Sequence, residues 1–184
     1  VMLGMMVGPS AVGLYAIATR LANLVLISQQ VGANVLGPHV ASLYANQEIK
    51  RLQALTRKST RAVVAYALPL TLGMIVFSPW LLSIFGPDFL ESRNILIVLC
   101  VSKLLNVSTG PVNLLLTMTH YERVNAVVTG VGAILNLILN FLLIPIYGPM
   151  GAALATGFTS IIANVILAII VYRRLGINST ILSY

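Results

Sequence analysis

Charged residues are scarce in this chain of 184 residues: only 8% are charged, whereas 58% are hydrophobic. A soluble domain carries roughly 25% charged residues. A soluble fold of this length could not bury so much apolar surface, so the bilayer must be its solvent. Helices are the open-chain structures that satisfy every backbone group in lipid. The composition therefore predicts an all-α polytopic membrane protein, with residues 1–184 forming a single transmembrane helical domain.

Groups that build catalytic and metal sites are also rare. Cys100 is the single cysteine, so there is no disulfide, and we expect it to be a small buried apolar residue. The two histidines, His39 and His120, have no neighbouring cluster of Cys, Asp or Glu, and we expect neither a metal nor another cofactor. Phosphate-binding glycine motifs and Ser/His/Asp arrangements are absent from the sequence, which argues against an enzyme.

Five segments are long and apolar enough to cross a bilayer, which takes about 20 residues as a helix. The chain opens on another apolar stretch, VMLGMMVGPS, which lacks the basic start and cleavage site of a signal peptide. We expect that stretch to end an upstream helix, and the chain to be part of a longer protein. The five predicted spans are residues 12–36, 62–85, 94–118, 125–144 and 151–172.

Basic residues predict the orientation of these spans. Eight of the eleven cations fall in connections on one side, against Arg93 alone on the other, so the positive-inside rule places the eight in the cytoplasm. Five of them lie in the connection 38–61, for which we predict a helix of its own. Its charges are either a solvated topology signal or a site for anionic membrane lipids. Because topology explains the net charge of +7, no nucleic acid is expected as a partner. The eight are Lys50, Arg51, Arg57, Lys58, Arg61, Arg123, Arg173 and Arg174.

Two further cations, Arg20 and Lys103, lie inside predicted spans, each about 12–14 Å below the outer face. Each begins a polar helix face with the same spacing, and such a face must contact protein or a wet cavity instead of lipid. The carboxamides on these faces either join helices by hydrogen bonds or bind a substrate. The first face holds Arg20, Asn23, Ile27, Gln30 and Asn34, and the second Lys103, Asn106, Gly110, Asn113 and Thr117.

All four acids fall in predicted loops, so no carboxylate of this chain is expected to neutralise either cation inside the membrane. The partner is then an upstream part of the protein or an anionic substrate. We predict that the polar members of the two faces bind the substrate. They are Arg20, Asn23, Gln30, Asn34, Lys103, Asn106 and Asn113, and the acids are Glu48, Asp88, Glu91 and Glu122.

Gly110 and Pro111 interrupt the span 94–118, whereas the other four Gly-Pro pairs mark span boundaries. Proline inside a helix removes one hydrogen bond and clashes with the preceding turn, so we predict a kink there. The kink either gates a transporter or is static. The last two spans carry small and polar residues at three- to four-residue spacing, which favours close helix packing, and we expect them to be scaffold. These residues are Thr129, Gly132, Asn136, Asn140, Gly151, Ala155, Thr159 and Ala163.

Four stretches, VGPSAVGLYAIATRLANL, SPWLLSIFGPDFLESRNILIVL, TMTHYERVNAVV and NLILNFLLIPIYGPMGAALAT, cover much of the chain. Together they resemble the polysaccharide flippases of the MATE-like multidrug/oligosaccharidyl-lipid/polysaccharide exporter superfamily, which includes O-antigen flippases. The resemblance implies that the five spans are helices 8 to 12 of a protein with two six-helix lobes. The N-terminal lobe of the same protein would then be a partner of this domain.

The resemblance also implies a function. Such proteins move lipid-linked oligosaccharides from the cytoplasmic to the outer leaflet of a bacterial or archaeal inner membrane by alternating access, for polysaccharide or lipopolysaccharide biosynthesis. The second and fourth helices of each lobe line the cavity, and these correspond to the spans of Arg20 and Lys103. Both cations would meet the pyrophosphate of a polyprenyl-linked sugar, while the carboxamides bind sugar hydroxyls. A multidrug exporter of the same fold, or a membrane-embedded enzyme of lipid-linked sugar metabolism, remains an alternative.

Overall fold

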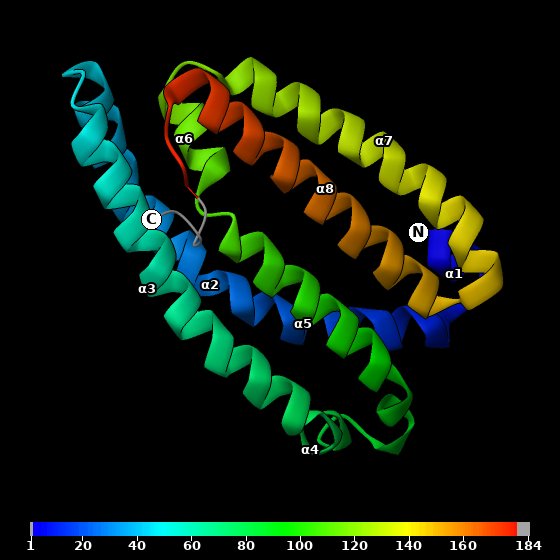
Figure 1. Cartoon of the computed structure of the whole chain (residues 1–184). Coiled ribbons are helices and arrows are strands. Elements are labelled where there is room, and N and C mark those ends of the chain that lie inside the picture. The colour runs from blue at the N-terminus through cyan, green and yellow to red at the C-terminus, as the bar shows by residue number, and fades with distance from the viewer. Residues whose placement is uncertain (1, 180–184) are drawn as a thin grey trace.

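The computed structural model describes residues 2–179, which form a bundle of helices with no strand in that range (Figure 1). Four helices, α2, α3, α7 and α8, are each long and apolar enough to cross a membrane, and residues 87–108 with 112–118 pass the same test together as a bent pair, either a broken span or a re-entrant loop. The predicted all-α membrane fold is confirmed. Residues 180–184, the end of the predicted tail, lie outside the described residues. The elements are α1 (Met2–Met6), α2 (Pro9–Ala45), α3 (Ile49–Val76), α4 (Ser78–Ser83), the 3-10 helix η1 (Pro87–Ser92), α5 (Arg93–Ser108), α6 (Val112–Met118), α7 (Glu122–Tyr147) and α8 (Pro149–Leu175).

Helix α5 lies at the centre of the bundle, where it packs against α2, α3 and α8, while α7 runs beside α8 on one side (Figure 1). Small residues of α2, among them Ala18 and Ala22, are fully buried and let α5 approach closely. Cys100 of α5 is buried in the same cluster, as predicted. The close packing positions the polar residues of α2 and α5 on neighbouring helices.

The predicted cytoplasmic connections gather at one end of the bundle. The α2–α3 turn, the α6–α7 turn and the end of α8 lie at that end in Figure 1, and the α7–α8 turn lies at the other. The common placement agrees with the predicted topology. Which end faces the cytoplasm stays a prediction from the basic residues.

The prediction of a separate helix in the connection 38–61 is wrong. Helix α2 continues through Pro38 to its end at Ala45, and α3 begins at Ile49, so the turn is residues 46–48. At 1.5 Å per residue α2 is about 55 Å long and α3 about 42 Å, whereas the hydrocarbon core measures about 30 Å. Both helices are therefore longer than the hydrocarbon core is thick, and the cationic part of the connection is the first half of α3. Arg51 there pairs with Glu48 at 2.7 Å.

The predicted span 62–85 extends past the observed end of the helix. Helix α3 stops at Val76, and a short separate helix, α4, follows it. The cause is Pro79, which has no N–H to donate to the carbonyl four residues earlier. Ser78 replaces that donor, because its Oγ donates to the carbonyl of Ile75 at 2.8 Å. The helix ends where the proline breaks its hydrogen-bond pattern.

Candidate functional site

The first predicted polar face is exposed along α2. Arg20, Asn23, Gln30 and Asn34 are all exposed, and Ile27 between them is 47% exposed. The predicted spacing therefore does bring these side chains onto one open side of α2. Apolar neighbours such as Val31 and Val35 are exposed beside them, so this surface of the described chain is mixed.

The second predicted polar face begins on α5 with Lys103, which is partly buried, and continues with Asn106, which is buried. The carboxamide oxygen of Asn106 accepts a hydrogen bond from Nδ2 of Asn164 on α8 at 3.2 Å. Asn164 also donates to the carbonyl of Ser160, one turn earlier. The bond between Asn106 and Asn164 joins two helices, so the structure supports the packing interpretation for Asn106.

Beyond Asn106 the second face does not continue on one helix axis. Helix α5 ends before Gly110, α6 begins after Pro111, and the two segments are bent by 44°. Gly110 has φ +82°, a conformation that glycine adopts without steric cost. The predicted kink is confirmed as a complete break. The uniform spacing assumed for one straight helix therefore fails for Asn113 and Thr117, which lie on α6.

Neither intramembrane cation has an anionic partner among the described residues. No carboxylate of residues 2–179 lies within ion-pair distance of Arg20 or Lys103. Over the same range, no cluster of His, Cys, Asp and Glu could hold a metal ion. The two helices that carry these cations, α2 and α5, pack against each other. The two cations thus lie on neighbouring helices, and the described residues provide no acid that neutralises either of them.

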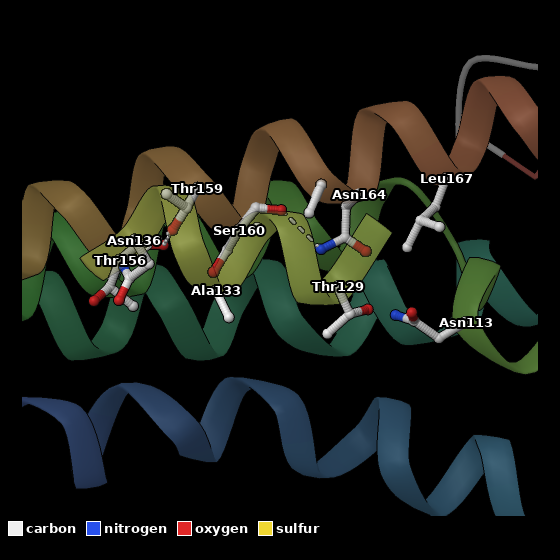
Figure 2. A pocket seen from close by; sticks show the side chains of 11 residues that line it. Asn113, Thr129, Ala133, Asn136, Thr156, Thr159, Ser160, Asn164 and Leu167 are labelled. Atoms are coloured by element: carbon white, nitrogen blue, oxygen red, sulfur yellow. Dashed lines mark hydrogen bonds between the residues drawn. The ribbon is translucent and has the colours of Figure 1, made fainter. Parts of the chain in front are cut away.

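A cavity of about 360 Å³ opens between α6, α7 and α8 and has a neutral polar lining (Figure 2). Asn113 reaches it from α6, Thr129 and Asn136 from α7, and Ser160 and Asn164 from α8. The amide nitrogen of Asn136 also donates to the hydroxyl of Thr159 across the helix pair at 3.1 Å. Hydroxyl and carboxamide groups both donate and accept hydrogen bonds, so this lining suits an uncharged, hydroxyl-rich ligand.

Only a scaffold role was predicted for α7 and α8, and none of their residues was predicted to belong to the site. Part of that expectation is confirmed, because Gly151 lies directly against the backbone carbonyl of Leu143 where the two helices meet. The cavity, however, uses Thr156, Ser160 and Asn164, which recur every four residues. That recurrence was a signal for one polar face, but hydroxyls at this spacing are also typical of helix packing. Of the predicted site residues, Asn113 contributes to this cavity.

Comparisons with known proteins agree with the helical membrane fold. The MatE family profile matches residues 1–142. The chain is 27% identical over 165 residues to the probable low-salt glycan biosynthesis flippase Agl15 of Haloferax volcanii, a match that covers 89% of this chain and 35% of that protein. It is 24% identical over 159 residues to the probable flippase AglR of the same organism, covering 85% of this chain and 33% of that protein. No solved structure matches.

The chain thus spans about a third of the length of the curated relatives that it matches. The family profile nevertheless covers more than half of this chain, and the two relatives match nearly all of it. The chain belongs to the MatE family, within the exporter superfamily that its motifs resemble.

Proposed function

We propose that the protein is a flippase that moves a lipid-linked oligosaccharide from the cytoplasmic to the outer leaflet by alternating access. Its membrane would be the cytoplasmic membrane of a bacterial or archaeal cell, and its product would feed polysaccharide biosynthesis. The described chain would act as the C-terminal lobe and would close the transport path together with an N-terminal lobe. The names of the two relatives, a probable low-salt glycan biosynthesis flippase and a probable flippase, support this proposal.

The observation that carries the proposal is the pair of intramembrane cations, Arg20 and Lys103, without a carboxylate among the described residues. A charged residue at the centre of a lipid-exposed helix costs roughly 2.5–3.5 kcal/mol on insertion scales. A diphosphate offsets this cost, since arginine binds it through a planar fork and lysine as a compact point charge. A cationic drug would instead be repelled, which disfavours the multidrug alternative.

The neutral cavity between α6, α7 and α8 supports the proposal that the substrate carries a sugar. Sugar hydroxyls need donors and acceptors, and the side chains of Asn113, Thr129, Ser160 and Asn164 supply both. The lining contains no charged residue. We assign the phosphate to the cations of α2 and α5, and the sugar to neutral groups of the predicted polar faces and of this cavity.

The test is a translocation assay with the full-length protein purified into liposomes. A fluorescent polyprenyl-pyrophosphate sugar is supplied in one leaflet, and its appearance in the other is measured by quenching from outside. We expect transport of this lipid, and none of a cationic dye. A protein that exports the dye but leaves the lipid in place is a multidrug exporter, and the proposed function is then wrong.

A further inference from the structure

Residues 176–179, which follow α8, fold back into the bundle. Residues 176–179, here called the C-terminal strap, begin at Gly176, which has φ +68° and donates its N–H to the carbonyl of Tyr172 at 3.0 Å. A left-handed glycine is a common end of a helix and reverses the chain. The strap then runs toward the break between α5 and α6 (Figure 1). Ile177 is fully buried and Ser179 is 2% exposed.

The strap supplies a hydrogen bond that the broken helix lacks. In a continuous helix the carbonyl of Thr109 would accept from the N–H of Asn113. Here the hydroxyl of Ser179 donates to that carbonyl at 2.9 Å. The Ser179 carbonyl accepts a hydrogen bond from the hydroxyl of Thr60 on α3 at 3.1 Å. The same hydroxyl also lies 2.9 Å from the carbonyl of Thr56. The strap therefore connects α3 to the hinge.

The strap also fills the space at the bend. A Cβ on Gly110 would collide with the Ser179 carbonyl oxygen and lie 2.7 Å from the Thr60 hydroxyl. Ile177 packs in the cluster that contains Leu52 of α3 and Leu115 of α6. Glycine at this position is thus required both by its positive φ and by contact with the strap.

We propose that the C-terminal strap is a latch that holds the α5–α6 hinge in its bent state. Lipid offers no donor for the Thr109 carbonyl, so this group bonds either to Ser179 in the bent state or to the Asn113 N–H in a straighter one. The Ser179 hydroxyl supports the bent backbone, whereas the Asn113 N–H would support a straighter one, so the hinge can act as a two-state element. Release of the strap frees α6 to move relative to α5. The consequence for transport rests on the proposed function, whereas the latch itself does not.

The latch is tested by thiol labelling in membranes, on the full protein with Cys100→Ala. An Ile177→Cys probe is buried while the strap is docked, and Ser42→Cys on the exposed end of α2 is the reference. We expect the probe to react at least about tenfold more slowly than the reference, a ratio that corresponds to about 1.4 kcal/mol of local opening free energy. Adding Gly110→Ala should expel the strap and speed labelling of the probe about tenfold or more. Gly130→Ala, which meets nothing within 4 Å, should not.

A second variant keeps the test decisive if Gly110→Ala does not fold. Ser179→Ala removes only the hydroxyl donated to the Thr109 carbonyl and should speed labelling of the Ile177→Cys probe about fivefold or more. A probe that reacts as fast as the reference in the parent, or an unchanged rate in the folded variants, overturns the latch. Transport is then measured on the Ser179→Ala variant. Absence of translocation by the parent itself contradicts the proposed function and leaves the labelling result to decide the latch.

Discussion

Replacing Lys103 with glutamine separates an anion-binding role from a structural one. Lys103 is partly buried on α5, and no described carboxylate lies within ion-pair distance of it. Glutamine keeps polarity and approximate length but removes the charge. Since a neutral side chain costs less than a charged one in the membrane, the variant should insert at least as well as the parent.

The effect on transport should be large. Removing one partner of a buried charge pair commonly costs 2–5 kcal/mol, because the other charge is left unpaired. Each 1.4 kcal/mol is a factor of ten, so transport of the diphosphate lipid should fall by about 30-fold to several-thousand-fold. Lys103→Arg keeps the charge and should retain part of the activity, although its fork has a different geometry. Arg20→Gln should also lower transport, by a smaller factor, because Arg20 is exposed among the described residues.

The matched control is Lys58→Gln, which removes an exposed lysine from the first half of α3. Protein abundance and transport are measured on the same membranes for Lys103→Gln, for Arg20→Gln and for this control. The control should keep both quantities. A loss of abundance in the two variants, with activity lost in proportion, would mean that both cations pair with acids elsewhere in the protein. Normal abundance together with normal transport in both would refute the anion site.

Three further predictions concern topology, the hinge and packing. A cysteine at Asp88 should be labelled from outside the cell, and one at Lys58 only after permeabilisation; the reverse pattern would invert the proposed orientation and with it the depth of the cations. Pro111→Ala should restore a backbone donor and straighten the α5–α6 bend. Transport should then slow, while the unfolding temperature stays the same or rises. An unchanged transport rate would mean that the bend has no gating role. Gly151→Ala should lower the free energy of unfolding by about 1–3 kcal/mol, because its Cβ would overlap a backbone carbonyl of α7. Gly130→Ala faces open space and is the control, and equal unfolding temperatures for the two alanine variants would contradict the packing seen here.

The sequence alone determined the features that depend on local chemistry. The ratio of apolar to charged residues requires a bilayer, and the apolar runs locate the spans. The break at Pro111 follows from a missing N–H, which is a property of that residue itself. The same missing N–H occurs at Pro38, Pro69 and Pro145, which lie inside continuous helices, so a proline alone does not locate the end of a helix such as α3. The spacing of Arg20, Asn23 and Gln30 likewise predicted that these side chains share one helix face. This prediction could be made locally because the three residues lie on one unbroken helix.

Tertiary structure decided the features whose partners are far apart in the sequence. Asn106 bonds to Asn164, 58 positions away, and this partner makes it a link between helices. The Ser179 hydroxyl donates to the carbonyl of Thr109, 70 positions away in the sequence. The residues around Gly110 therefore do not reveal which group contacts the hinge. The neutral cavity lies where α6, after the bend, packs against α7 and α8 and contributes Asn113 to the lining. A polar side chain in a membrane needs a hydrogen-bonding partner, but its own sequence neighbourhood does not say which group that partner is.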